Sequence, residues 1–284
     1  MINDFLNSIA LKAKKEILIN ECDYQKDGLW YCGKCNTPKE CNFNSPLFGG
    51  IHRVLCKCEQ EKEEEEKKKL EFEQISIKKE HIFEELIRDK IQNIADLKDT
   101  FESDLYPNSK KSIMFRKYCE KWKEVKTNNI GMIISGSVGT GKTFYANCIA
   151  NEIRQKYRDL CVTITSKQIT ELSIFDRADY IKKFIYADLL VIDDLGAERL
   201  TEASQEAIFD LIDERKKVEK PTIVTTNLTM EDFKNPHSTQ QSRIFDRINE
   251  MCGKNTVQMD GISKRQDIAR NKSKELKNII FNDQ

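Results

Sequence analysis

The chain has 284 residues, a length that corresponds to about two ordinary domains or one large one. Its 47 Lys and Arg residues balance its 47 Asp and Glu residues, which excludes a polycation that coats nucleic acid along its whole length but not a local basic groove. No apolar run approaches the roughly 18 residues of a membrane-spanning helix, and the N-terminal segment lacks a signal-peptide core. We therefore expect a cytoplasmic protein with no membrane partner.

The N-terminal part of the chain differs chemically from the rest. Apolar residues recur at helical spacing within residues 2–17, which predicts an amphipathic helix. Residues 28–58 are rich in cysteine and turn-forming residues. Residues 59–69 are a run of Glu and Lys with opposite charges four positions apart, which favours an exposed helix or linker.

Six of the ten cysteines lie in the first 58 residues and include two close-spaced pairs. Zinc favours four ligands in a tetrahedron, and each pair can supply two thiolates from one tight turn. The predicted zinc ligands are Cys32, Cys35, Cys56 and Cys58. Cys41 and His52 are alternative ligands. Four thiolates leave no open coordination position, so the predicted role of this zinc is structural.

From about residue 96 onward, short apolar segments alternate with helical patterns. This alternation predicts an α/β fold with a mostly parallel, five-stranded sheet covered by helices on both faces. The predicted strands are Met132–Ser135, Cys161–Thr165, Leu189–Ile192, Thr222–Thr226 and Thr256–Met259. The cysteines of this part are scattered, and we expect them to be small buried apolar residues. They are Cys119, Cys148, Cys161 and Cys252.

A phosphate-binding loop follows the first of these strands and precedes a predicted helix. Residues 136–143 have the pattern G-x-x-x-x-G-K-T, whose glycines allow backbone N–H groups to surround phosphates at the positive end of the helix. The predicted nucleotide contacts are Gly136, Ser137, Val138, Gly139, Thr140, Gly141, Lys142 and Thr143. We expect Lys142 to reach the β- and γ-phosphates of ATP and Thr143 to bind Mg²⁺.

Polar residues end two other predicted strands. Asp193 and Asp194 follow the strand at residues 189–192, and the carboxyl end of a buried strand is where ligands bind in open α/β sheets. We expect Asp193 to hold Mg²⁺ and Asp194 to orient or deprotonate the attacking water. Asn227 follows the next strand; it can bridge the γ-phosphate and that water, or simply end the strand in a turn.

Two arginines, Arg243 and Arg247, lie one helical turn apart in the segment SRIFDRI. A guanidinium group suits phosphate charge, so either residue can act as an arginine finger in the nucleotide site of a neighbouring subunit. The alternative is an ion pair within the helix, for example between Arg243 and Asp246.

The motifs GSVGTGKT, LLVIDDLGAER, TTNLT, SRIFDR and GISKR, in this order, resemble the DnaC/DnaI-type replicative helicase loaders, an IstB-like branch of the AAA+ ATPases, over about residues 96–270. The resemblance implies an αβα AAA+ core, assembly on a replicative helicase hexamer with ATP between neighbouring subunits, and binding of single-stranded DNA. By position, Asn227 takes the sensor-1 role, and Arg243 takes the arginine-finger role with Arg247 beside it. Arg265 matches the second sensor arginine. Many AAA+ proteins have Glu at the position of Asp194.

The sequence thus predicts a zinc-binding, partner-binding region with a charged helical linker at residues 1–95 and an AAA+ ATPase domain at residues 96–284. The predicted function is ATP-dependent loading of a replicative DNA helicase onto single-stranded DNA during the initiation of replication, with ATP, Mg²⁺ and Zn²⁺ as cofactors. The alternatives are a transposition helper ATPase of the IstB kind and a binding module in which nucleotide acts only as a clamp. Candidate DNA contacts are Ser166, Lys167, Lys182 and Lys183, although the lysines also fit a solvated helix face.

Overall fold

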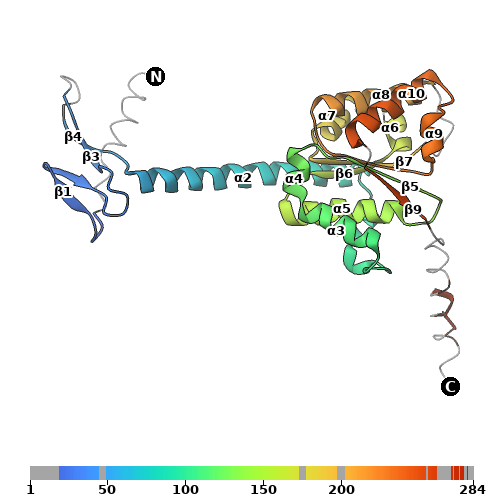
Figure 1. Ribbon diagram of the computed structural model, residues 1–284, viewed down its shortest axis with the longest axis horizontal. Coiled ribbons are helices and arrows are strands. Elements are labelled where there is room, and N and C mark those ends of the chain that lie inside the picture. Colours follow the sequence, from blue (N-terminus) through green and yellow to red (C-terminus); the bar gives the residue numbers. More distant parts are fainter. Residues whose placement is uncertain are drawn as a thin grey trace. The chain divides into compact units, whose positions relative to one another are not determined.

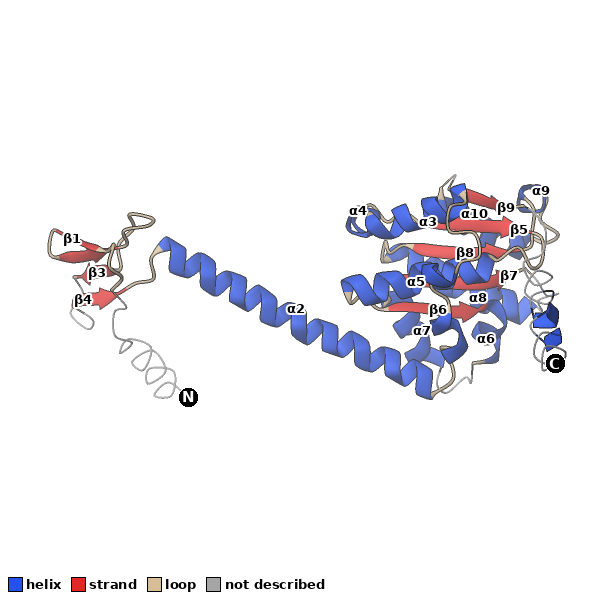
Figure 2. Ribbon diagram, turned by 90° about the horizontal axis from the view of Figure 1, so that it is seen from below, coloured by secondary structure: helices blue, strands red, loops and turns tan. Residues whose placement is uncertain are grey.

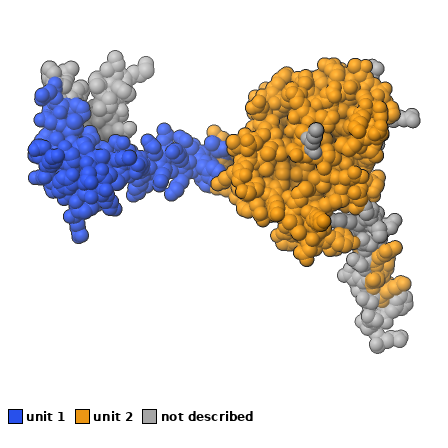
Figure 3. Space-filling view, in the orientation of Figure 1, with its two compact units in different colours: residues 1–75 blue, residues 76–284 orange. Residues whose placement is uncertain are grey.

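The computed structural model describes residues 19–44, 49–172, 177–196, 202–253 and 255–260, with a few positions between 270 and 280. The amphipathic helix predicted within residues 2–17 lies outside these residues. The chain divides into two compact units, residues 1–75 and 76–284, which Figure 3 shows in different colours. The boundary between the units lies within the long helix α2 (Lys57–Arg88), and the predicted domain boundary near residue 95 stays a prediction.

The first unit contains two antiparallel hairpins. They are formed by β1 (Tyr24–Lys26) with β2 (Leu29–Tyr31) and by β3 (Glu40–Phe43) with β4 (Gly50–Arg53). Asp27 and Gly28 connect β1 to β2. Their φ angles, 52° and 78°, are positive, as tight hairpin turns require. The sequence predicts turns here, but these strands are too short to show a pattern of their own.

The charged segment at residues 59–69 forms part of α2, in agreement with the predicted exposed helix. Its ion pairs, such as Lys62–Glu66 at 3.9 Å, are exposed and contribute little stability. The C-terminal part of the helix, which belongs to the second unit, buries Phe83 and Leu86 in the core. No helix within the described parts of the chain has both the length and the apolar character needed to cross a membrane.

The second unit is built on a five-stranded parallel sheet with the order β6-β7-β8-β5-β9, seen face-on in Figure 2. The strands are β5 (Met132–Gly136), β6 (Cys161–Thr165), β7 (Leu189–Leu195), β8 (Thr222–Thr226) and β9 (Thr256–Met259). All five predicted strands are confirmed, and β7 continues beyond its predicted end through an irregularity that follows Ile192.

Helices cover both faces of this sheet, as Figure 1 shows. One face packs against α3 (Lys110–Glu120), α4 (Trp122–Thr127) and α5 (Lys142–Tyr157). The other packs against α6 (Ser166–Glu171), α7 (Arg177–Tyr186), α8 (Glu202–Lys217) and α10 (Thr239–Cys252). Shorter helical segments are η1 (Ile94–Lys98), η2 (Phe101–Ser103) and α9 (Met230–Lys234). The predicted αβα architecture is therefore confirmed.

Alternation along the strands divides the interior into two cores. Ile133 points into the core that contains α8 and α10, whereas its neighbour Ile134 points into the core that contains α5. Cys119, Cys148, Cys161 and Cys252 are all buried, as predicted. The strand β7 is apolar from Leu189 to Ile192, so its charged side chains lie at the two edges of the sheet, Asp188 before the strand and Asp193 and Asp194 near its end.

The amino-terminal ends of β6 and β7 carry a buried network of charges. Lys79 Nζ lies 2.7 Å from a carboxylate oxygen of Asp159 and 2.7 Å from one of Asp188. Lys126 Nζ contacts the same two aspartates at 2.9 and 2.8 Å. The indole N–H of Trp122 donates to Asp159 at 2.8 Å. This network attaches α2 and α4 to the beginning of the sheet.

Candidate nucleotide and metal sites

The opposite edge of the sheet, where the strands end, holds the predicted phosphate-binding loop. The loop leaves β5 at Gly136 and enters α5 at Lys142, so the N-terminus of α5 points toward the space above the loop. Gly136 has a φ of 146°, and a Cβ at this position would lie 2.2 Å from the Met259 carbonyl oxygen. A side chain cannot fit there, which explains the glycine at the beginning of the loop.

Thr143 and Asp193 meet across the site, although 50 positions separate them in the sequence. The Thr143 hydroxyl donates to the two carboxylate oxygens of Asp193 at 2.9 and 3.1 Å. The hydroxyl of Thr225, from β8, also donates to this carboxylate. Burial raises the pKa of Asp193 above its usual value despite these hydrogen bonds. A hydroxyl and a carboxylate are oxygen ligands of the kind that Mg²⁺ prefers, so the residues present fit this metal.

Asp194 has an unusual backbone conformation. Its φ is 52°, in the left-handed region that residues other than glycine seldom adopt, and its side chain is exposed while both its neighbours are buried. Its N–H donates to the Thr225 hydroxyl at 3.0 Å, and its carbonyl accepts from Ser166 at 3.1 Å. The surrounding chain therefore holds the Asp194 carboxylate toward the cavity, and such conformations are often found at functional sites.

Lys142 and Asn227 also meet in this site. Lys142 is 5% exposed, and its ammonium group donates to the Asn227 side-chain oxygen at 2.7 Å. It also donates to the carbonyl oxygens of Gly136 and Ser137, both at 3.0 Å. The side chain that ends β8 is therefore in direct contact with the loop lysine.

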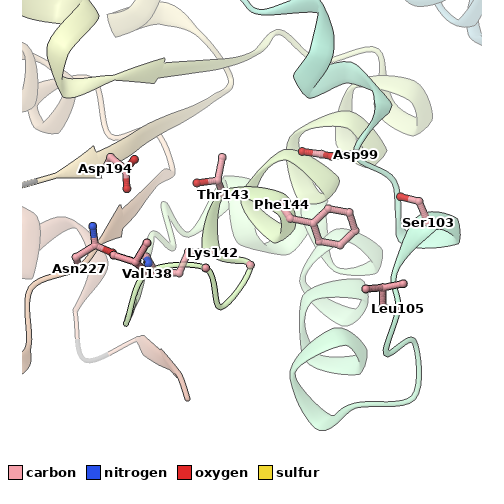
Figure 4. Close-up of a pocket in the computed structure, with 11 residues that line it drawn as sticks. Asp99, Ser103, Leu105, Val138, Lys142, Thr143, Phe144, Asp194 and Asn227 are labelled. Carbon is pink, nitrogen blue, oxygen red and sulfur yellow. The ribbon is translucent and has the colours of Figure 1, made fainter. Parts of the chain in front are cut away.

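Lys142, Thr143, Asp194 and Asn227 line a cavity of about 500 Å³, together with Val138, Gly139 and Gly141 of the loop. This volume is suited to a nucleotide. Figure 4 shows Asp194 and Asn227 on one side of the loop and Asp99, Ser103 and Leu105 on the other, beyond Phe144. No sequence motif predicts the far side of the cavity. Phe144 could have been found because it follows the loop directly, but Asp99, Ser103 and Leu105 precede the loop by some thirty or more positions and belong to no motif.

Neither Arg243 nor Arg247 is among the described residues that line this cavity. Arg243 is exposed on α10, and Arg247 forms ion pairs with Asp213 and Glu250. Arg265 lies outside the described residues. A finger role for Arg243 or Arg247 therefore requires the site of another subunit and remains a prediction.

The candidate DNA contacts differ in exposure and in the residues that they contact. Ser166 is buried, and its hydroxyl is used in the hydrogen bond to Asp194. Lys167 is exposed and forms an ion pair with Glu171 at 3.6 Å, while Lys183 pairs with Glu85 at 2.9 Å. The contacts of both lysines fit the solvated helix faces that the sequence left as an alternative.

The first unit brings the four predicted zinc ligands together. The sulfur atoms of Cys32, Cys35, Cys56 and Cys58 lie within 4.8 Å of one another. Tetrahedral zinc thiolates are separated by about 3.8 Å, so small adjustments complete the geometry. Cys41 and His52, the alternative ligands, instead face each other across β3 and β4 and are not part of this group.

The surroundings of the four sulfur atoms also fit a structural metal. The Thr37 hydroxyl, 3.0 Å from the Cys35 sulfur, lowers the pKa of Cys35 to about 5, whereas burial raises the pKa of Cys56 to about 12. Four adjacent thiols cannot all ionise without a compensating cation, which a divalent zinc ion supplies. Thr37 also accepts from the N–H of Lys57 at 2.9 Å and thus links the two cysteine pairs.

The turn of the first cysteine pair depends on a close backbone approach. A Cβ on Gly33 would lie 1.8 Å from the carbonyl oxygen of Cys22, so only glycine fits between the two ligands. The Gly33 N–H donates to Asp23 at 3.0 Å, and Asp23 forms a buried ion pair with Lys39 at 2.6 Å. Cys22 thus contributes to this module through its backbone.

The fold and the loop define a P-loop nucleotide-binding protein of the AAA+-like α/β class. Residues 77–273 match the model of the IstB-like ATP-binding proteins. This match covers more than half of the chain, which therefore belongs to that family.

Two relatives are replicative helicase loaders by name. The chain is 25% identical over 149 residues to the replicative helicase loader DnaI of Bacillus subtilis. The aligned segment covers 48% of this chain and 47% of the relative. It is 29% identical over 124 residues to the replicative helicase loader DnaC of Escherichia coli. This aligned segment covers 42% of the chain and 49% of DnaC. The matched segments thus span about half the length of these relatives, and the chain is a distant homologue of both.

A crystal structure of the DnaC helicase loader superposes on this chain with a TM-score of 0.51 and 20% sequence identity. The superposition covers 59% of this chain and all of the solved one. It supports the assignment of the fold.

Proposed function

We propose that the chain is a Mg²⁺-dependent ATPase whose active site is the cavity at the carboxyl ends of β5, β7 and β8. The observation that most supports this proposal is the contact between Thr143 and Asp193, because a hydroxyl and a carboxylate are the kinds of oxygen ligand that Mg²⁺ prefers and these two lie beside the phosphate-binding loop. Membership of an ATP-binding family supports ATP as the nucleotide.

In this proposal, the backbone N–H groups of the loop and the positive end of α5 bind the phosphates. Lys142 neutralises charge on the β- and γ-phosphates, and Thr143 and Asp193 hold Mg²⁺, which stabilises the charge that develops during phosphoryl transfer. Asp194 accepts a proton from the attacking water, which Asn227 orients. Its exposed carboxylate at the cavity supports this role for Asp194.

We further propose that this ATPase loads a replicative DNA helicase hexamer onto single-stranded DNA. The similarity to two proteins named as replicative helicase loaders supports this function. ATP binding joins neighbouring copies of the chain through their nucleotide sites, with Arg243 of one copy reaching the γ-phosphate held by the next. Hydrolysis then releases the assembly. The zinc-binding unit acts as the partner-binding region.

The experiment that tests the loader function is ATP hydrolysis by the zinc-loaded full chain, with and without single-stranded DNA and a replicative helicase. We expect either addition to stimulate turnover, and Arg243→Ala to abolish the stimulation. Turnover that is indifferent to both additions would leave the ATPase but contradict the loader.

The second candidate is a transposition helper ATPase of the IstB kind, and membership of the IstB-like family supports it. Such a protein remodels a transposase on double-stranded DNA. Capture of a transposase but not a replicative helicase, together with stimulation by double-stranded but not single-stranded DNA, would support this candidate over the loader.

For the proposed zinc site, the matched variants are Cys35→Ser and Cys41→Ser. Cys35 belongs to the four-sulfur group, whereas Cys41 lies on β3 outside it. We expect one zinc ion per chain, measured by elemental analysis, to be lost in Cys35→Ser and retained in Cys41→Ser. Equal zinc content in the two variants would contradict this ligand set.

A further inference from the structure

The strand β7 contains a bulge near its carboxyl end. The register of β7 against β8 shifts by one residue between Ile192 and Leu195. The two residues of β7 between them, Asp193 and Asp194, therefore stand opposite the single residue Thr225 of β8. Consecutive side chains of a regular strand point to opposite faces of the sheet, so a bulge at this position allows two adjacent acids to serve one site.

The hydroxyl of Thr225 contacts both acids, each in a different way. Its oxygen accepts from the backbone N–H of Asp194 at 3.0 Å, and its proton is donated to the carboxylate of Asp193. Because an N–H group can only donate, the single proton of the hydroxyl is left for Asp193. Thr225 is completely buried, so bulk water does not compete for these hydrogen bonds. One side chain thus holds the backbone of one acid and the carboxylate of the other.

The left-handed backbone of Asp194 depends on its neighbours. Its φ of 52° is unfavourable for a residue that has a Cβ atom. The hydrogen bond from its N–H to Thr225 and the one from Ser166 to its carbonyl hold the residue on both sides. Its carboxylate lines the cavity. Removing the Thr225 hydroxyl would leave the Asp194 N–H without this partner and favour a backbone that aims the carboxylate elsewhere.

The carboxylate of Asp193 is held between hydroxyls from two different elements. Thr143 of α5 and Thr225 of β8 both donate to its Oδ1 atom. Thr143 is itself a proposed ligand of Mg²⁺, so Thr225 is the hydroxyl that can orient the carboxylate independently of the metal. A carboxylate that is oriented in advance loses less entropy when a metal binds, and hydrogen bonds to metal ligands tune both affinity and activity.

We propose that Thr225 is a positioning residue that sets the geometry of both acids for metal-dependent ATP hydrolysis. The proposal rests on the ATPase activity of the proposed function and deepens it. Thr225 acts through Asp193 on the metal and through Asp194 on the attacking water. Loss of its single hydroxyl therefore disturbs both steps at once.

Thr226, the next residue of β8, offers a matched control. It is equally buried, and its hydroxyl also bridges the chain: it donates to the carbonyl oxygen of Leu195 at 2.6 Å and accepts from the N–H of Leu228 at 3.0 Å. Both of these partners are backbone groups of apolar residues. Thr225→Val and Thr226→Val thus each remove one buried bridging hydroxyl from the same strand and keep the shape of the side chain, but only the first removes a contact with the acids.

The test uses the zinc-loaded full chain and two readouts, steady-state ATP hydrolysis and calorimetric titration with ATP in the presence and absence of Mg²⁺. Thr225→Val should lower kcat by about 10- to 100-fold and the gain in ATP affinity that Mg²⁺ provides by about 3- to 10-fold. ATP affinity without Mg²⁺ should equal that of the parent chain, because the phosphate-binding loop is intact. Thr225→Ser, which keeps the hydroxyl, and Thr226→Val should both stay close to the parent in both readouts.

The outcomes separate this role from the proposed function. If the parent chain neither hydrolyses ATP nor gains ATP affinity from Mg²⁺, the proposed function is overturned and the role of Thr225 falls with it. If the parent is active, the role alone is overturned when Thr225→Val behaves like the parent, or when Thr225→Ser or Thr226→Val loses as much as Thr225→Val. Chemical denaturation establishes that each variant is folded, and Thr225→Ala replaces Thr225→Val in the comparison with Thr225→Ser if the valine variant does not fold.

Discussion

The two ends of the strands in the parallel sheet carry the same kinds of side chain, aspartates and lysines, in different surroundings. Where β7 begins, Asp188 is held by Lys79 and Lys126 at 2.7 and 2.8 Å. Where β7 ends, Asp193 accepts from the neutral hydroxyls of Thr143 and Thr225. Burial acts to raise the pKa of both aspartates, but the two ammonium groups outweigh it at Asp188 and hold that pKa well below its usual range, whereas the pKa of Asp193 is raised.

The difference shows which end of the sheet is organised for a ligand. At the amino-terminal end, opposite charges neutralise one another within the fold, so this network stabilises the protein. At the carboxyl-terminal end, Asp193 accepts from two hydroxyls beside a cavity that Lys142, Thr143 and Asp194 line. A carboxylate held by hydroxyls can bind an incoming cation strongly, as expected of a metal site.

The largest expected effect is on ATP binding by Lys142→Ala. Removing the ammonium group should weaken ATP binding by about 100-fold, because charge-assisted contacts to phosphate are lost. The free energy of unfolding should change by less than about 1 kcal/mol, since Lys142 lines the cavity and donates there to the oxygens of Gly136, Ser137 and Asn227. Calorimetric titration with ATP and chemical denaturation measure the two quantities, and unchanged ATP affinity would contradict the assignment of the loop.

The complementary change at the other end of the sheet is Asp188→Ala. It leaves Lys79 and Lys126 with Asp159, removes the carboxylate that pairs with Lys220, and should lower the free energy of unfolding by about 2–3 kcal/mol. The lysines are partly exposed, which keeps the expected loss below that of a fully buried pair. ATP affinity should be unchanged, and a stability equal to that of the parent chain would contradict the proposed role of this network.

The same variant has a defined pH dependence. The pKa of Asp188 is lower in the folded than in the unfolded chain, where it is near 3.8. Its stabilising contribution is therefore complete above about pH 4 and disappears as the pH falls toward the folded-state pKa. The difference in unfolding free energy between the parent and Asp188→Ala should accordingly shrink below pH 4 in denaturation experiments. A difference that is constant from pH 7 to pH 3 would show that charge pairing is not its cause.

The smallest expected effect, and one of opposite sign, is that of Asp96→Asn beside the nucleotide site. Burial and the nearby charges of Asp99 and Asp193 raise the pKa of Asp96 to about 6. Ionisation of Asp96 therefore destabilises the fold increasingly from about pH 4 to pH 6. Without nucleotide or Mg²⁺, the variant should be more stable than the parent by about 1 kcal/mol at pH 7.5 and no different at pH 3.5. Destabilisation at pH 7.5 would contradict this balance of charges.

The sequence predicted those features whose residues are contiguous or repeat at a regular spacing. The five strands, the loop at residues 136–143 and the two cysteine pairs are of this kind, because apolar periodicity and short motifs are local properties. The far wall of the cavity, with Asp99 and Leu105, was missed because it joins the loop only through folding. The Asp159 and Asp188 network was missed for the same reason, since its lysines come from distant helices.

The most direct test of the central claim is Mg²⁺-dependent ATP hydrolysis by the zinc-loaded full chain, compared with Asp193→Ala and Asp188→Ala under conditions in which all three proteins are folded. These variants remove one carboxylate from either end of the same strand. We predict that turnover is lost in Asp193→Ala and retained in Asp188→Ala. Turnover that persists in Asp193→Ala, or is lost equally in both variants, would contradict the assignment of the catalytic site to the carboxyl end of the sheet.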